Sequence, residues 1–177
     1  VIFQEDLRRL FERLAIIGRF GGQPAGGAKR GDTEILAATA ANLARNHIGA
    51  IIVLKGKDPL ERHLGSGTAL DGLISQELLE SLFDPHSPGH DGAVIITGNR
   101  ITHFGCHLPL STNMGRNGAT GLRHTAALGL AERADALCIV VSEERGSISL
   151  ARNEKIRVLS SGLELRNELE KFYRELA

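Results

Sequence analysis

Two continuous apolar runs of strand length place the strongest constraint on how this chain can fold. Residues 49–55 read Gly-Ala-Ile-Ile-Val-Leu-Lys, and residues 136–141 read Ala-Leu-Cys-Ile-Val-Val. A strand with one face in water alternates apolar and polar residues, whereas a strand covered on both faces is apolar throughout. Both runs are therefore predicted to be inner strands of a sheet that carries helices on its faces.

Helical and strand patterns alternate along the rest of the chain. Helices are expected over residues 1–19, 33–47, 75–83, 121–134 and 162–176, and strands over 93–97, 100–107 and, as the last strand, 147–152. Asp32 is expected to cap the second helix, and the turn Gly98-Asn99 joins two strands as a hairpin. This order predicts a single globular α/β domain whose mixed parallel and antiparallel central sheet is flanked by helices. A doubly wound dinucleotide fold is not indicated, because no Gly-x-Gly-x-x-Gly follows a strand.

A glycine-rich segment over residues 20–31 is expected to be a flexible loop. Residues 21–31 contain five glycines and one proline, a composition typical of flexible linkers. The segment approaches a phosphate-binding P-loop but does not match one. Ala28 separates Gly27 from Lys29, no Ser or Thr follows the lysine, and no strand precedes it.

The charge balance limits the kinds of partner that this chain can bind. Lys and Arg total 21 and Asp and Glu total 21, so the formal net charge is zero. A general electrostatic attraction to nucleic acid or to anionic lipid is therefore not indicated. Any phosphate site must be built locally, from a few cationic side chains and backbone amides.

Other features bear on the compartment. The chain has no run of about 18 apolar residues and no signal-peptide pattern. Cys106 and Cys138 lie in apolar stretches without metal-ligand spacing and are predicted to be buried, reduced thiols of a cytosolic protein. Because the chain begins at Val1 rather than at a methionine, we expect it to be part of a longer protein.

The first candidate functional segment is residues 90–93, His-Asp-Gly-Ala. Asp91 stands at the mouth of a predicted strand, where a carboxylate is a good ligand for Mg²⁺ or Mn²⁺. Gly92 would let a ligand approach the backbone closely, since it has no side chain. Asp-Gly before a strand is also common as a simple turn, and spacing alone favours that interpretation.

The second segment, residues 121–125 (Gly-Leu-Arg-His-Thr), opens a predicted helix. The first amides of a helix have no partners within it and carry partial positive charge, so they bind phosphate. Arg123 adds a planar fork that suits phosphate oxygens, and His124 could donate to a phosphate. The alternative is a solvated helix start with an ordinary surface Arg-His pair.

Two strand ends complete the set of candidate segments. Ser142, Glu143 and Glu144 follow a buried strand, where functional carboxylates of α/β folds often lie, although the composition also suits an exposed hairpin turn. Residues 108–110 (Leu-Pro-Leu) end another strand and could form an apolar ledge for adenine, or could reflect termination of the strand by proline.

The histidines allow a competing interpretation. Asp84, His86, His90 and Asp91 could form the metal cluster of a hydrolase, but their loop has two prolines and no helix that would place the histidines on one face. The remaining histidines are scattered and are expected to be surface residues or satisfied core residues: His47, His63 and His103.

Taken together, these segments resemble the diadenylate cyclase catalytic domain, and most closely that of the membrane-anchored bacterial cyclases. The matching stretches occur in family order and cover nearly the whole chain outside the glycine-rich loop. They are residues 1–4, 7–9, 90–96, 98–101, 105–106, 108–111, 123–124, 126–129 and 140–144. Each stretch is weak alone, but the ordered set is specific.

The resemblance implies an activity and a mechanism. Two ATP molecules would be condensed to cyclic di-AMP with release of two pyrophosphates. Each protomer would bind one ATP with Mg²⁺ or Mn²⁺, and two protomers would meet face to face in an at least transient homodimer. Each 3′-hydroxyl would then attack the α-phosphate of the other ATP. Phosphoryl transfer of this kind needs mainly positioning and neutralisation of charge.

The resemblance also implies roles for individual residues. The catalytic residues would be Asp91, Arg123 and His124. The metal ligands would be Asp91, Glu144 and His90. The ATP-binding residues would be Gly92, Ala93, His107, Leu108, Gly121, Leu122, Arg123, His124, Thr125, Ser142 and Glu143.

The chain departs from the family at positions that concern the nucleotide. Residues 122–125 read Leu-Arg-His-Thr where the family usually has Thr-Arg-His-Arg, and His107 stands where members often carry Tyr or Phe. A hydroxyl and a guanidinium are therefore missing from the expected phosphate site, and charged hydrogen bonds contribute about 1.5–3 kcal/mol each. Because Thr125 replaces the usual arginine, the alternative function is a nucleotide-binding module with weak or no cyclase activity.

The resemblance further implies a location and partners. The chain would be the cytoplasmic domain of a longer protein that an N-terminal segment anchors in the bacterial cell membrane. A membrane-bound regulator and a phosphoglucosamine mutase would be partners, in addition to ATP and a second copy of the chain, whereas no nucleic acid is expected.

Overall fold

The computed structural model describes residues 30–113 and 121–177. The helix expected over residues 1–19 and most of the glycine-rich loop lie outside this part. The helices are α2 (Arg30–Arg45), α3 (Gln76–Phe83), α4 (Leu122–Ala131) and α5 (Gly162–Leu176), with a short 3₁₀ helix, η1 (Glu61–His63). The strands are β1 (Ala50–Lys55), β2 (Thr68–Leu73), β3 (Ala93–Thr97), β4 (Arg100–Cys106), β5 (Ala136–Val141), β6 (Ile148–Arg152) and β7 (Lys155–Val158).

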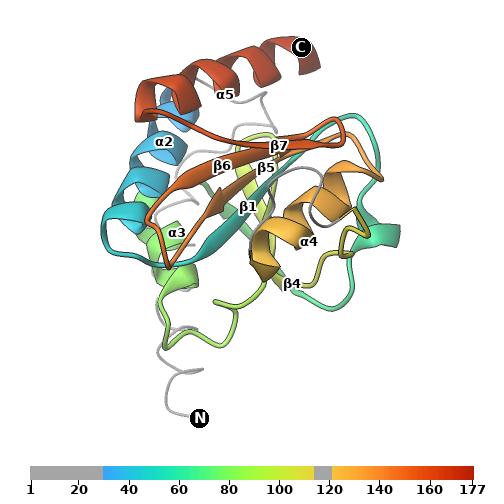
Figure 1. Ribbon diagram of the computed structural model, residues 1–177, viewed down its shortest axis with the longest axis horizontal. Helices are drawn as coiled ribbons and strands as arrows, with labels where there is room; N and C mark the ends of the chain where they lie inside the picture. The colour runs from blue at the N-terminus through green and yellow to red at the C-terminus, as the bar shows by residue number, and fades with distance from the viewer. Residues whose placement is uncertain (1–29, 114–120) are drawn as a thin grey trace.

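The strands form one mixed sheet in the order β2-β4-β3-β1-β5-β6-β7. β1 pairs with β3 in parallel and with β5 in antiparallel orientation, and the other pairs are antiparallel. The α2, α3 and α5 helices cover one face of this sheet, and α4 covers the other (Figure 1). The predicted α/β class with a mixed sheet flanked by helices is confirmed.

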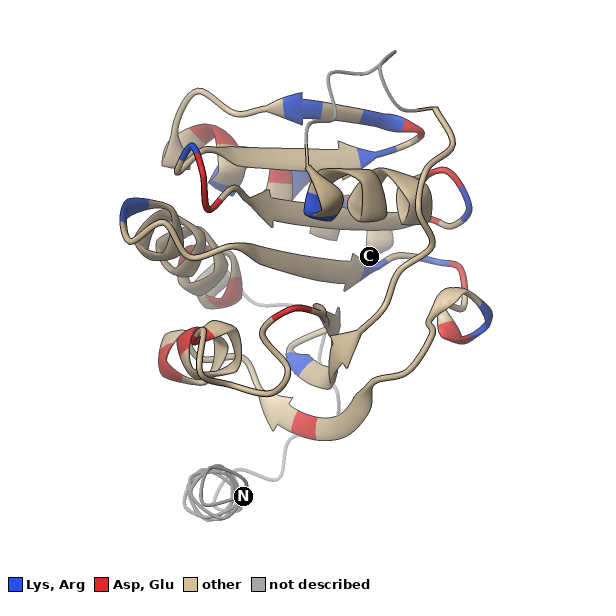
Figure 2. Ribbon diagram, turned by 60° about the horizontal axis from the view of Figure 1, so that its bottom comes forward, with Lys and Arg blue, Asp and Glu red and all other residues tan. Residues whose placement is uncertain are grey.

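The two apolar runs are inner strands, as predicted. In β1, Ile52 and Leu54 pack into the core beneath α2, α3 and α5, whereas Ile51 and Val53 pack against α4 on the opposite face. Every residue of β5 is buried. Figure 2 shows that β5 carries no charged residue and β1 carries one only at its end, Lys55, while charged residues occur along the edge strands. Burial on both faces explains why neither run alternates apolar with polar residues.

Both cysteines are free and buried, as expected. Burial raises the pKa of the Cys106 thiol to about 11 and that of the Cys138 thiol to about 12. Both side chains are therefore protonated at neutral pH and serve as small apolar groups of the core.

Several expected boundaries are wrong. Asp32 is not a cap, because α2 begins at Arg30 and therefore includes the last two residues of the expected loop. The α2 and α4 helices end at Arg45 and Ala131 rather than at 47 and 134. The strand over 147–152 is not the last one, since β7 follows it.

The two outermost strands, β2 and β7, were not expected from the sequence. Their residues are mostly exposed or half-buried, because each strand has a neighbour on one side only. Polar residues on such edges discourage pairing with other chains, and they also remove the apolar pattern that would announce a strand.

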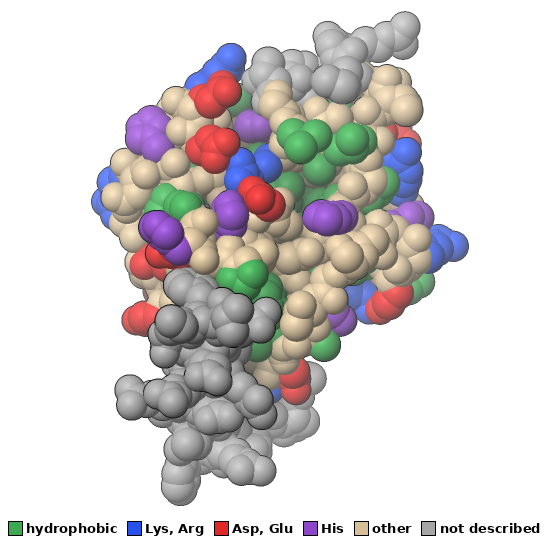
Figure 3. Space-filling model, turned by 90° about the horizontal axis from the view of Figure 1, so that it is seen from below, with side chains coloured by type: hydrophobic (Ala, Val, Ile, Leu, Met, Phe, Trp, Pro, Cys, Tyr) green, Lys and Arg blue, Asp and Glu red, His purple; other side chains and the backbone are tan. Residues whose placement is uncertain are grey.

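The end of the sheet where β1 begins and β5 ends is the face seen in Figure 3. Because β5 runs antiparallel to β1, the carboxyl end of β5 lies beside the start of β1, and Ala50 pairs with Val141. Histidine, acidic and cationic side chains gather near the middle of this face. The topology therefore brings two segments that are about 90 residues apart in the chain to one place.

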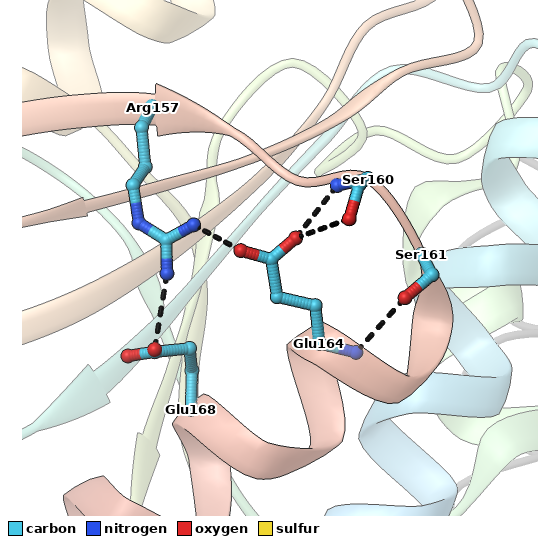
Figure 4. A network of polar contacts seen from close by, with 5 residues as sticks. All are labelled: Arg157, Ser160, Ser161, Glu164 and Glu168. Atoms are coloured by element: carbon cyan, nitrogen blue, oxygen red, sulfur yellow. Dashed lines mark hydrogen bonds and ion pairs between the residues drawn. The ribbon is translucent and has the colours of Figure 1, made fainter.

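A polar network fastens the β7 edge to the start of α5 (Figure 4). Ser161 caps the helix, with its hydroxyl accepting a hydrogen bond from the Glu164 amide at 3.1 Å. The Glu164 carboxylate accepts from the Ser160 amide at 2.7 Å and pairs with Arg157, which also pairs with Glu168 at 3.0 Å. The Ser160 amide and then Arg157 lower the pKa of Glu164 to about 2.

This network predicts an acid-dependent loss of stability. The Glu164 pKa falls on folding from its ordinary value of 4.5, so the ionised carboxylate stabilises the fold above pH 4.5. That stabilisation is lost as the pH falls from 4.5 towards 2. In thermal melts, Glu164→Gln should melt below the wild type at pH 7, and the gap should narrow at pH 3. Glu61→Gln, a change at an exposed glutamate in η1, is the control and should show no such narrowing; an unchanged gap in Glu164→Gln would contradict the prediction.

Candidate active site

A cavity of about 760 Å³ opens at the end of the sheet where β1 begins. Its walls come from the end of α2, the start of β1, the loop before β3, the end of β4, the start of α4 and the turn after β5. Segments far apart in the sequence therefore share one hollow, which is large enough for a nucleotide-sized ligand.

Most of the residues that sequence analysis singled out line this cavity. They are His90, Asp91, Ala93, His107, Leu108, Gly121, Leu122, Arg123, His124, Ser142, Glu143 and Glu144. Gly92 and Thr125 are not among the lining residues. A Cβ at Gly92 would lie 2.3 Å from the Gly105 carbonyl carbon, so the close approach of β3 and β4 already requires glycine there. Thr125 is 2% exposed, and its hydroxyl donates to the Gly121 carbonyl oxygen at 3.0 Å.

Arg123 occupies a central position between two carboxylates. Its Nη1 lies 3.1 Å from a Glu143 oxygen, and its Nη2 lies 3.7 Å from Asp91 Oδ1. The guanidinium also lies over Gly49, where an added Cβ would come within 2.4 Å of Nη1. Gly49 therefore leaves the space that Arg123 fills.

His90 and Asp91 form a pair that suits a divalent cation. The carbonyl oxygen of Ser87 can only accept, so the His90 Nδ1–H donates to it at 2.6 Å, and Nε2 is left facing Asp91 Oδ1 at 3.2 Å. Two ligands that bind one Mg²⁺ at about 2.1 Å and at a right angle lie about 3.0 Å apart. The pair thus fits two neighbouring ligands of one ion.

The described residues do not supply a complete metal cage. In residues 30–113 and 121–177, no group of three or more His, Cys, Asp or Glu side chains could hold a metal ion. The four-residue hydrolase cluster is therefore absent from this part of the chain, and His86 is an exposed residue paired with Asp84 at 3.0 Å. A metal bound by His90 and Asp91 would need oxygen ligands from its substrate.

The imidazole of His124 is neutral near pH 7. Burial lowers its pKa below the ordinary value of 6.5, and the positive charge of Arg145 lowers it further. Its Nε2 lies 3.4 Å from the hydroxyl of Ser149, which is buried on β6. A neutral imidazole at a helix start can donate one hydrogen bond to a phosphate without a fixed charge of its own.

The part of the cavity lining that follows β4 is held by two close approaches. His107 forms an isolated bridge with Gly65, and its Nδ1 lies 3.2 Å from the Ser66 hydroxyl. The stretch around Pro109 lies directly on α4, because a Cβ at Gly129 would come within 2.0 Å of the Pro109 oxygen. The side chain of Leu110 is left half-exposed beside the cavity.

Sequence reasoning missed several residues of the site. His47 and Gly49 line the cavity, although His47 was expected to be an ordinary surface or core residue. A glycine directly before an apolar strand, and another inside a helix at Gly129, are signals of close packing that could have been used. Ser66 had no such signal, because its partner lies 41 residues away.

The fold and the site together define a class of protein, an α/β domain with a polar cavity at one end of its mixed sheet. A cationic helix start and carboxylates converge on one cavity, as binding of a phosphorylated ligand and its metal requires. The chain belongs to the family described as DisA bacterial checkpoint controller nucleotide-binding, which matches residues 37–156. The resemblance noted from the sequence is therefore confirmed.

Related proteins support the same assignment. The chain is 38% identical over 156 residues to the cyclic di-AMP synthase CdaA of Bacillus subtilis, covering 86% of this chain and 57% of that protein. It is 37% identical over 159 residues to a diadenylate cyclase of Listeria monocytogenes, covering 88% of this chain and 58% of that protein. The chain thus spans a little over half the length of these relatives.

Two solved structures share the fold. DacA from Staphylococcus aureus, a double mutant, aligns with a TM-score of 0.76 and 36% identity over 80% of this chain and 95% of that one. A Bacillus cereus protein described as a hypothetical membrane spanning protein aligns with a TM-score of 0.69 and 38% identity over 72% and 62%. In the described part of this chain, no helix has both the length and the apolar content that crossing a membrane requires.

Proposed function

We propose that this chain is a diadenylate cyclase domain, which condenses two ATP molecules to cyclic di-AMP and releases two pyrophosphates. The observation that carries the proposal is the placement of the Arg123 guanidinium 3.7 Å from the Asp91 carboxylate in one cavity. A cation for the triphosphate and an acid for the metal thus face the same space. The names of the relatives, cyclic di-AMP synthase and diadenylate cyclase, support the same activity.

The triphosphate would bind at the start of α4. The Thr125 amide already donates to the Gly121 carbonyl, whereas the amides of the first helical residues before it have no partner within the helix. These amides, the Arg123 fork and the neutral His124 would together receive the phosphate oxygens. The zero net charge of the chain makes such local placement necessary.

His90 and Asp91 would hold Mg²⁺ or Mn²⁺ together with oxygen atoms of the substrate. Glu144 lines the same cavity but forms no three-residue metal group with them among the described residues, so it would become a ligand only if the turn after β5 moved. When bound, the ion would neutralise phosphate charge and favour ionisation of the attacking 3′-hydroxyl. Asp91 is 78% exposed, so its side chain can leave Arg123 and turn towards an incoming ion. Such a movement would free the Nη2 edge of Arg123 for a phosphate.

The nucleoside would lie against the lining residues that follow β4 and β5. The backbone around Leu108 and the ring of His107 would contact adenine, and Ser142 with Glu143 would contact the ribose. His107 offers less stacking area than Tyr or Phe. The Ser66 hydroxyl at 3.2 Å orients the ring and so offsets part of that loss.

The reaction would need two protomers. Each 3′-oxygen forms a bond to the α-phosphorus of the other ATP, and each α-phosphorus loses its bond to a pyrophosphate, which departs. The cavity binds one ATP under this proposal, and Leu110 and Leu122 at its edge are 50% and 72% exposed. A homodimer, at least a transient one, would bring two such sites face to face.

The direct test is to incubate the purified protein with ATP and MnCl₂ or MgCl₂ and to separate the products by chromatography. We expect cyclic di-AMP, with a rate per protomer that rises with protein concentration because a dimer must form. Tight ATP binding without product under either metal would overturn the proposal and select the nucleotide-binding module. That alternative rests on Thr125, because its hydroxyl donates a hydrogen bond to the Gly121 carbonyl oxygen within the helix start rather than facing the cavity.

Other implications of the resemblance stay predictions. They are a membrane anchor in a longer protein, a membrane-bound regulator, binding of a phosphoglucosamine mutase, and the absence of nucleic-acid partners.

A further inference from the structure

The end of α2 carries a residue that is unusual for its position. The Ile48 amide donates to the Leu43 carbonyl at 2.9 Å and the His47 amide donates to the Ala44 carbonyl at 3.1 Å, which is the pattern of a Schellman motif. His47 therefore occupies the position that normally carries glycine, and it adopts a left-handed φ of 52°. A non-glycine residue held in this conformation is a reason to look for a function of its side chain.

The His47 side chain fastens the turn between β5 and β6 to the end of α2. Its Nδ1 lies 3.0 Å from the Glu143 carbonyl oxygen. Since a carbonyl only accepts, Nδ1 must carry the proton and donate it. The turn also packs tightly there, because a Cβ at Gly146 would lie 2.8 Å from the Ala44 oxygen and 3.2 Å from His47 Cε1.

The same turn places the carboxylate that holds Arg123. Glu143 receives the His47 hydrogen bond at its backbone, and its side chain pairs with Arg123 Nη1 at 3.1 Å. The Glu143 side chain is 59% exposed, so the position of its backbone does most to fix it. Contacts therefore run from the end of α2 through His47 and Glu143 to the guanidinium in the cavity.

We propose that His47 is a positioning residue, which fixes the β5–β6 turn so that Glu143 holds the Arg123 guanidinium in its binding orientation. The expected effect on kinetics rests on the proposed function. The contact of His47 with the β5–β6 turn and the pairing of Glu143 with Arg123 do not depend on it. Without the His47 donor, the turn moves more freely and Glu143 no longer holds one edge of the fork. Binding of phosphate must then also order the Arg123 side chain, and the lost conformational entropy weakens the binding.

Two substitutions separate the hydrogen bond from backbone strain. In His47→Gly the position receives its usual residue, so the donor is removed and no strain is added. In His47→Asn the left-handed conformation is tolerated, and the asparagine Nδ2 can donate from nearly the place of the histidine Nδ1.

Steady-state cyclase assays and thermal melts of these variants test the proposal. We expect His47→Gly to lower kcat/KM for ATP about fivefold without lowering the melting temperature, and His47→Asn to recover most of that loss. An unchanged kcat/KM in His47→Gly would overturn the proposal. Failure of His47→Asn to recover would also overturn it, because it would mean that the ring contacts the nucleotide through Nε2, for which asparagine has no counterpart. His63→Gly, at a histidine of η1 outside the cavity lining, is the matched control.

A second readout does not depend on catalysis. In nucleotide-free protein, NMR of the Arg123 guanidinium measures rotation about the Cζ–Nε bond, which the pairing with Glu143 slows. We expect faster rotation in His47→Gly than in the wild type, and wild-type behaviour in His47→Asn. Equal rotation in all three proteins would overturn the inference. A wild-type protein that forms no cyclic di-AMP would instead refute the proposed function and leave this comparison valid.

Discussion

Asp91→Asn should reduce the rate of cyclic di-AMP formation by at least about 100-fold, through kcat rather than through the affinity for ATP. The amide keeps the size of the side chain but removes the negative charge that would hold the metal. That charge now lies 3.2 Å from the His90 Nε2, the other proposed ligand. The same change removes an anion that would repel the triphosphate. Binding of a non-reactive ATP analogue without metal should therefore stay the same or become tighter.

Initial rates of product formation, measured by chromatography over a range of MnCl₂ concentrations, give the kcat effect, and calorimetry gives the affinity for the analogue. Asp84→Asn is the matched control, because it changes an aspartate of the same loop that pairs with His86 outside the cavity lining. The Asp91 side chain is 78% exposed, so the melting temperature should not fall. Activity within threefold of the wild type, with the same metal dependence, would rule out Asp91 as a metal ligand.

Arg123→Ala is expected to lower kcat/KM for ATP about 100-fold and to weaken nucleotide binding itself. Without the guanidinium, the Asp91 and Glu143 carboxylates both face the cavity with no cation between them, and they repel a triphosphate. Arg123→Lys restores a positive charge but not the planar guanidinium, which in the wild-type protein pairs with Glu143 at 3.1 Å. We therefore expect it to recover only part of the activity, leaving a deficit of about tenfold.

Calorimetry with the ATP analogue and steady-state kinetics measure these two effects. Arg100→Ala is the control, since Arg100 pairs with Asp71 on β2 and does not line the cavity. ATP affinity within twofold of the wild type in Arg123→Ala would mean that the triphosphate binds elsewhere. The comparison with Asp91→Asn is informative, because one change should act on affinity and the other on turnover.

The elements that could be predicted from the sequence are those whose pattern is local. The runs in β1 and β5 are apolar along their whole length, and α5 carries both its cap, Ser161, and a clear amphipathic face. Such segments have one low-energy way to bury their side chains, whatever the rest of the chain does. The edge strands β2 and β7 form because a neighbouring strand offers hydrogen bonds, so their own residue patterns do not predict them.

The residue types at the site can be recognised from the sequence alone: an acid before β3, an arginine at the start of α4, and two glutamates after β5. Their convergence on one cavity cannot, since it depends on the sheet topology. The antiparallel pairing of β1 with β5 and the parallel pairing of β1 with β3 bring the ends of these strands to one side of the sheet. The tertiary structure also gave His47 and Gly49 their places beside Arg123. Their contacts arise from strand register and helix packing, which no local pattern of residues encodes.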